Sequence, residues 1–208
     1  MKLKSSVAAA LLLLAAMPAL ADKVKIEPYK SEVVLEPTPD GECHWWRVGC
    51  PRDPEGLPPE APRAGAVITI DTANNIAYLY RDGSLVAKGA AATGMDKFMT
   101  KGTRRWLFRT PRGRHRILRK VVDPVWVKPD WAFIEEGKPI PSKDSASRRV
   151  RGKLGKYALD LGDGIMIHGT DDPSSLGRKA SHGCIRVGAE LLKQMYRASD
   201  VGTEVWIF

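Results

Sequence analysis

A cysteine and two histidines form the part of this sequence whose residue types and spacing could do chemistry. In the segment KASHGCIRV, His182 lies two positions before Cys184, and His168 ends the alternating apolar segment IMIH earlier in the chain. A thiol attacks a carbonyl carbon as the thiolate, so it needs a neighbouring base or cation to lower its pKa from about 8.5. Both histidines are candidates for that base, and the pattern indicates a cysteine nucleophile.

Small residues surround the cysteine. Gly183 allows a tight turn immediately before Cys184, because glycine has no Cβ to restrict its backbone. Gly169 and Ser181 leave room for backbone N–H groups to point at a developing oxyanion, which is what acyl transfer requires.

Two other interpretations of the same residues stay open. His168, His182 and Cys184 are zinc ligands by type, although a structural zinc site usually has four ligands and no further cysteine or histidine lies nearby in sequence. Alternatively, the thiol is buried and inert, and the histidines bond to backbone groups.

The first residues predict export. Lys2 and Lys4 precede a short apolar run, and Ala19-Leu20-Ala21 has the form of a signal-peptidase site. The run is shorter than the roughly 18 to 20 residues that span a bilayer. We therefore expect residues 1–21 to be a cleaved signal peptide, and the mature protein to lie in the periplasm or cell wall without stable membrane insertion.

The charge of the chain predicts an anionic partner. The net charge is +9, and loss of two lysines with the signal peptide leaves +7. Nucleic acid is the common partner of such basic proteins, but export argues against it. An acidic envelope polymer or a membrane surface then remains.

Residues 22–65 are rich in proline, which predicts an irregular extension around the Trp45-Trp46 pair. Cys43 and Cys50 close a short loop, and in an oxidising compartment we expect them to form a disulfide that leaves Cys184 unpaired. A pairing of Cys184 with one of them is the rival arrangement.

The elements that must position the site are mostly strands. The segments AVITID, IAYLYR and SLVAKGAA are separated by turn residues, and YALDL and IMIHGT flank a Gly-Asp-Gly turn. One helix is predicted over residues 189–198, before a closing strand EVWIF. The fold class is therefore mostly β, a sandwich or barrel with one or two short helices.

A basic stretch at residues 101–120 contains nine lysines or arginines and no acidic residue. It is either a solvated surface or a surface near the cleft that holds anionic substrate. Neutralising Arg104, Arg105 and Arg109 separates these two possibilities.

The segment IHGTDDPSSLGRKASHGCIRV resembles the signature of the L,D-transpeptidase catalytic-domain family, in which an HG dipeptide precedes a Ser/Thr-His-Gly-Cys motif. Upstream, RTPRGRHRI and DPVWVKPDW are similar to two further segments of that family. The resemblance covers residues 66–208 and implies an L,D-transpeptidase-like β-sandwich.

The resemblance also implies roles for individual residues. Cys184 attacks a peptidoglycan tetrapeptide stem at its third residue, releases D-alanine and forms a thioester, while His168 moves the proton. An amine from another stem then forms a 3→3 cross-link, and an amine-bearing envelope protein is a second candidate acceptor. No metal or organic cofactor is required. Ser181, His182 and Gly183 order the site and the oxyanion, and we expect substrate contacts from Gly169, Thr170, Arg186 and Trp126.

Two further functions fit the same residues. Water can resolve the thioester, which gives an L,D-carboxypeptidase or endopeptidase. A non-catalytic wall-binding protein is the third possibility, against which the presence of both His168 and Cys184 argues.

Overall fold

The computed structural model describes residues 24–28, 58 and 60–208. Three expectations fall outside the described residues: the signal peptide 1–21, the Cys43–Cys50 disulfide and the Trp45-Trp46 pair.

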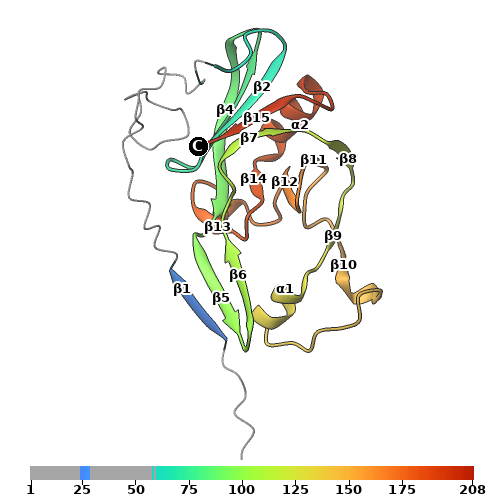
Figure 1. Ribbon diagram of the computed structural model, residues 1–208. Coiled ribbons are helices and arrows are strands. Elements are labelled where there is room, and N and C mark those ends of the chain that lie inside the picture. Colours follow the sequence, from blue (N-terminus) through green and yellow to red (C-terminus); the bar gives the residue numbers. More distant parts are fainter. Residues whose placement is uncertain (1–23, 29–57, 59) are drawn as a thin grey trace, which may run out of the picture.

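A large curled sheet dominates the described chain (Figure 1). Its strands follow the order β7 (Gly113–Arg116), β15 (Glu204–Ile207), β2 (Ala66–Asp71), β3 (Ile76–Arg81), β4 (Ser84–Gly94), β14 (Ile185–Val187), β12 (Ile165–His168), β11 (Tyr157–Gly162) and β8 (Arg119–Val122), and β13 (Lys179–Ser181) also pairs with β4.

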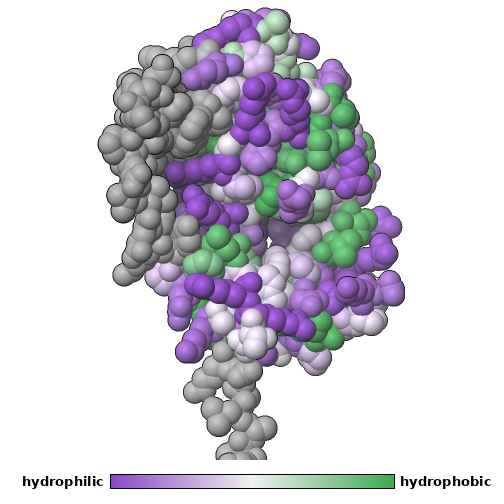
Figure 2. All heavy atoms as spheres, viewed as in Figure 1, coloured by the Kyte–Doolittle hydropathy of each residue, from purple (hydrophilic) through white to green (hydrophobic). Residues whose placement is uncertain are grey.

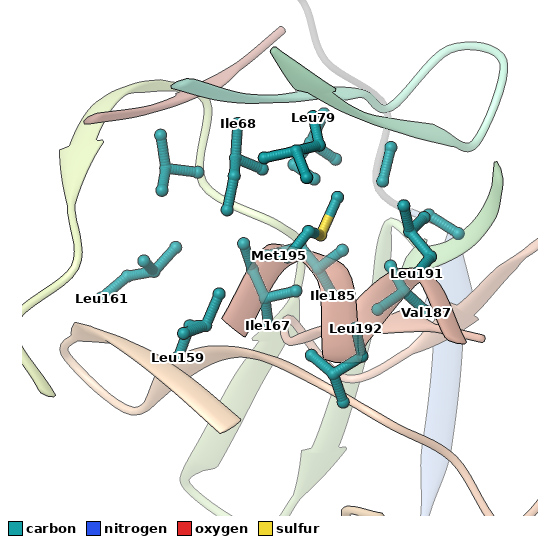
Figure 3. Close-up of a cluster of buried hydrophobic side chains, with 14 of the residues drawn as sticks. Ile68, Leu79, Leu159, Leu161, Ile167, Ile185, Val187, Leu191, Leu192 and Met195 are labelled. Carbon is teal, nitrogen blue, oxygen red and sulfur yellow. The ribbon is translucent and has the colours of Figure 1, made fainter. Parts of the chain in front are cut away.

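The sheet curls around one amphipathic helix, α2 (Ala189–Ala198), which supplies much of the core. Figure 3 shows Leu192 and Met195 of this helix among apolar side chains of β2, β3, β11, β12 and β14. Each fully buried aliphatic side chain contributes about 1.5 to 3 kcal/mol. Ile167 and Ile185 belong to this core, so packing holds in place the strands that lie next to His168 and Cys184.

Smaller elements complete the described chain, and in the view of Figure 1 the β5–β6 hairpin and α1 lie side by side below the large sheet. They are β1 (Lys25–Pro28), β5 (Lys97–Lys101) and β6 (Arg104–Phe108), which form a three-stranded sheet; β9 (Val125–Val127) and β10 (Arg149–Arg151), which pair; the helix α1 (Asp130–Glu135); and the 3₁₀ turns η1 (Ala146–Arg148) and η2 (Pro173–Ser175).

A buried arginine holds the segment around α1 in place. The Arg148 guanidinium donates to the backbone carbonyls of Lys128, Pro141 and Ser142 and to the Asp130 carboxylate. Its side chain is only 7 % exposed, so this charge is stabilised by hydrogen bonds on several sides. One side chain thereby connects the start of α1 to the loop that follows the helix.

The expected strands and the helix at 189–198 are confirmed, and the mostly β fold with two short helices is confirmed as well. The irregular structure expected over residues 22–65 is wrong at residues 25–28, where β1 pairs with β5 along its length. The β5–β6 hairpin was not expected, because its basic composition masks the alternation of a strand. No helix in the described ranges is long and apolar enough to cross a membrane.

Candidate active site

Cys184 and His168 are brought together by the pairing of two short parallel strands. His168 is the last residue of β12, and Cys184 directly precedes β14. The register pairs Ile167 with Ile185 and His168 with Arg186. The end of β12 therefore overlaps the beginning of β14, and this stagger brings His168 close to Cys184.

The thiol of Cys184 is unpaired and partly buried. Its S–H donates to the Gly164 carbonyl oxygen, with Sγ and O 3.3 Å apart. Burial raises the pKa of the thiol above its ordinary value, while a backbone hydrogen bond from Met166 and the Arg186 charge oppose the increase. At rest the group is a thiol, so attack on a carbonyl requires a base that removes its proton.

His168 has the properties of such a base. Its ring is buried, and Nδ1 lies 2.6 Å from the Gly169 carbonyl oxygen. A carbonyl can only accept, so Nδ1 carries the hydrogen and Nε2 is left with its lone pair. Burial lowers the pKa of His168 to about 4, and the ring is therefore neutral and able to accept a proton near pH 7.

The turn before the cysteine requires glycine. Gly183 has φ +135°, and a Cβ there would lie 3.3 Å from the Arg109 carbonyl oxygen. The Thr110 hydroxyl donates to the Gly183 carbonyl oxygen over 2.8 Å and accepts from the Gly94 amide over 2.8 Å. Thr110, which sequence reasoning placed only in a Thr-Pro-x-Gly segment, thus fixes the turn from a distant part of the chain.

Ser181 holds the same turn from within. Its hydroxyl donates to the Cys184 carbonyl oxygen and accepts from the Gly183 amide, with Oγ and N 3.1 Å apart. The Gly183 amide, expected to bind an oxyanion, is therefore already engaged and would have to exchange this bond to do so.

His182 points into a different environment from His168. Its ring stacks on Trp131 with centroids 4.0 Å apart and meets the Phe108 ring edge-on at 4.5 Å. Nε2 lies 2.9 Å from the Glu135 carboxylate. Burial lowers the pKa of His182, and the Glu135 charge and hydrogen bond act to raise it. None of these three contacts was expected from the sequence. Only Trp131 lies in a segment that the sequence analysis singled out, as the last residue of DPVWVKPDW.

Two groups of residues contribute to the lining of a cleft of about 690 Å³. We call residues 163–168 and 181–186 the inner wall and residues 104–109 and 130–135 the outer wall. Figure 2 shows hydrophobic side chains in separate patches among hydrophilic ones on the face that it displays. The lining from the two walls includes Met166, His168, Ser181, His182, Cys184, Arg186, Leu107, Arg109, Trp131 and Glu135.

The residues expected to contact substrate fall into two groups. Trp126 and Arg186 line the cleft, whereas Gly169 and Thr170 lie outside its lining. The Gly169 amide donates to the Leu154 carbonyl over 2.8 Å, and the Thr170 hydroxyl caps the turn at Asp172.

Each of the two histidines uses one ring nitrogen for a hydrogen bond within the protein. Nδ1 of His168 faces a carbonyl, and Nε2 of His182 faces a carboxylate. Among the residues that the structure describes, no group of three His, Cys, Asp or Glu could hold a metal ion.

The basic stretch 101–120 divides into two parts. Arg114 and Arg116 pair with Glu204, and Arg119 pairs with Asp160. The earlier part forms β6 and reaches the cleft through Arg109. The expectation that this stretch lies near the cleft therefore holds for its first part.

A free thiol beside a buried neutral imidazole is typical of enzymes that transfer acyl groups through a cysteine. The family described as the L,D-transpeptidase catalytic domain (YkuD) matches residues 65–207, and the chain belongs to this family.

Curated relatives agree with this assignment. A putative L,D-transpeptidase of Fuscovulum blasticum is 34% identical over 105 residues, which is 46% of this chain and 49% of the relative. The probable L,D-transpeptidase YbiS of Escherichia coli K12 is 32% identical over 93 residues, which is 43% of this chain and 30% of the relative. The matches thus span half or less of the length of these relatives.

Solved structures agree on the fold. An L,D-transpeptidase from Xylanimonas cellulosilytica superposes with TM-score 0.52 at 22% identity, covering 74% of this chain and 65% of that chain. An L,D-transpeptidase from Mycobacterium smegmatis superposes with TM-score 0.50 at 23% identity, covering 70% and 59%.

Proposed function

We propose that this protein is an L,D-transpeptidase that acts on peptidoglycan tetrapeptide stems through a thioester on Cys184. The observation that carries the proposal is the pairing of an unpaired thiol with a buried histidine whose free Nε2 is neutral near pH 7. Family membership supports the same reaction class.

In the first half-reaction, His168 Nε2 takes the thiol proton and Cys184 Sγ attacks the carbonyl carbon between the third residue and the terminal D-alanine. The Cys184 amide lies at the turn where the oxyanion develops. The carbon–nitrogen bond then breaks, and His168 returns the proton to the departing D-alanine amine. A thioester remains on Cys184.

In the second half-reaction, an amine attacks the thioester carbonyl. A carbon–nitrogen bond forms, the carbon–sulfur bond breaks, and the amine proton passes through His168 to the sulfur. The amine of a third residue in another stem gives a 3→3 cross-link, and an amine of an envelope protein gives an attachment to the wall.

The other residues would support these steps. Ser181 and His182 would hold the turn that carries the nucleophile, and Trp126 and Arg186 would contact the stem from the cleft lining. The Arg186 charge acts to lower the pKa of Cys184, which favours the thiolate. With the signal peptide 1–21 removed, residues 66–208 would act as the catalytic domain in the periplasm or cell wall.

Product analysis tests the proposal. Purified protein is incubated with muropeptides that contain tetrapeptide stems, and the products are identified by mass spectrometry. We expect released D-alanine together with stems joined through their third residues. Formation of tripeptides without any joined stems would mean that the protein is a hydrolase and not a transferase. Unchanged muropeptides would overturn both enzymatic assignments.

A further inference from the structure

Most charged side chains of the cleft are already paired. Glu135 bonds to His182, and Glu136 pairs with Lys128 and Lys138. A further ion pair joins Lys153 to Asp171, with Nζ and Oδ2 2.8 Å apart. These charges balance one another before any substrate enters.

Two charges in the cleft lining differ from these. Arg186 and Asp163 both line the cleft, and neither forms an ion pair within the described chain. One is a cation and the other an anion. They are therefore available to charged groups of a substrate.

Both charges line the same cleft as the nucleophile. Arg186 is the middle residue of β14 and follows Cys184 by two positions, and both side chains line the cleft. Asp163 is in the turn between β11 and β12, next to Gly164, whose carbonyl oxygen accepts the thiol hydrogen bond at 3.3 Å. The cleft that contains the sulfur thus offers one cation and one anion without an ion-pair partner in the described chain.

The two substrates of the proposed reaction carry opposite charges near the reacting atoms. The donor brings the carboxylate of its terminal D-alanine. The acceptor brings a primary amine, which is an ammonium ion at neutral pH because alkylamines of this kind have pKa values of about 10. The charges of the cleft match this order, with the cation suited to the donor and the anion to the acceptor.

We propose that Asp163 recognises the ammonium group of the acyl acceptor and directs it to the thioester on Cys184. This inference rests on the proposed function. The ammonium ion binds beside the Asp163 carboxylate and gives one proton to solvent, and the neutral amine then attacks the thioester carbonyl. Asp163 is a specificity residue in this scheme, because it selects amines over water.

The turn permits a clean test. Asp163 has φ +50°, a conformation that asparagine and glycine adopt readily, so Asp163→Asn and Asp163→Gly preserve the turn while removing the charge. Asp144→Asn is the matched control, because Asp144 is an exposed acid in another turn and does not line the cleft.

The donor is a tetrapeptide stem with its third-residue side-chain amine acetylated, so that it can acylate the enzyme but cannot accept. Two acceptors are compared: Nα-acetyl-lysine amide, which is cationic, and methoxyamine, which is uncharged at neutral pH. The measured quantity is the ratio of aminolysis product to hydrolysed tripeptide at increasing acceptor concentration.

We expect both Asp163 variants to raise the concentration of acetyl-lysine amide needed for half-maximal aminolysis by about three- to fivefold, the range of an exposed ion pair. The methoxyamine dependence should not change, and Asp144→Asn should match the unaltered protein. The inference is overturned if the Asp163 variants respond to both acceptors like the unaltered protein, or if they weaken both acceptors equally. If the unaltered protein forms no thioester with the donor, the proposed function fails, and the inference fails with it.

Discussion

The inner and outer walls of the cleft are built in different ways. The inner wall joins Cys184 and His168 through one parallel strand pair, and a packed core lies behind it. The outer wall consists of the short helix α1 and the strand β6, and it meets the inner wall around the ring of His182. We infer that the inner wall carries the proposed chemistry and that the outer wall positions its residues.

The two histidines express this difference. Burial lowers the pKa of His168 to about 4, and the Gly169 carbonyl oxygen keeps the ring hydrogen on Nδ1. His182 has a carboxylate partner and aromatic neighbours, and the carboxylate opposes the lowering of its pKa. The neutral ring of His168, with its free Nε2, is suited to proton transfer. The ring of His182, which contacts two aromatic rings and a carboxylate, is suited to positioning the turn before Cys184.

The largest expected effect concerns the nucleophile. Cys184→Ala should reduce D-alanine release from tetrapeptide stems by at least about 10³-fold, because no other thiol is available in the described chain. Thermal unfolding should change little, since the side chain is small and only partly buried. Release near the rate of the unaltered protein would show that the inner wall does not carry the nucleophile.

His168→Gln should have the next largest effect, a loss of about 10² to 10⁴-fold in acylation, which is the usual contribution of general base catalysis. Glutamine is similar in length but cannot accept a proton from the thiol. Stopped assays of D-alanine release measure the effect. A loss smaller than that of a His182→Gln control would reverse the roles given to the two walls.

Burial of His168 also predicts how stability depends on pH. Its folded pKa of about 4 is below the ordinary value of 6.5, so between these values the unfolded chain binds a proton that the folded chain does not. The free energy of unfolding should therefore be fully retained above pH 6.5 and fall by roughly 3 kcal/mol as the pH drops toward 4. Denaturant titrations at pH 4.5 and 7 measure the change, and His168→Gln should remove most of this difference.

The sequence predicted the inner wall and only part of the outer one, for physical reasons. The strands that flank the Gly-Asp-Gly turn and helix 189–198 have regular local patterns, and the HG and SHGC motifs place the reacting groups directly. Phe108 and Glu135 reach His182 only through tertiary packing, which no spacing along the chain records. The hairpin at 97–108 was also hidden by exposed basic residues, although Met99 and Phe108 face a buried cluster.

Glu135→Gln should have a moderate effect of about tenfold, because it weakens one charge-assisted hydrogen bond to His182 and leaves the Trp131 stacking in place. The pH dependence of acylation should shift with it, since the carboxylate acts to raise the pKa of His182. Glu136→Gln is the control, because that carboxylate pairs with lysines. Equal pH profiles for the two variants would contradict a positioning role for Glu135.

The smallest expected effect separates the two parts of the basic stretch. Lys101→Gln combined with Arg105→Gln should weaken binding to isolated sacculi by roughly threefold at low salt, and the difference should vanish at high salt. Arg114→Gln combined with Arg116→Gln should instead lower the unfolding temperature, because both side chains pair with Glu204. Sacculus pull-down and thermal unfolding of both variants decide the point, and identical behaviour in both assays would remove the distinction.

Mass spectrometry of the intact protein during turnover tests the central claim most directly. With a tetrapeptide stem whose acceptor amine is acetylated, we predict an adduct with the mass of the stem minus D-alanine, and digestion should place it on the peptide that contains Cys184. Hydroxylamine should remove the adduct, as it does for thioesters, and Cys184→Ala should form none. Turnover of the stem without this adduct, or an adduct on another residue, would contradict the assignment of Cys184 as the nucleophile.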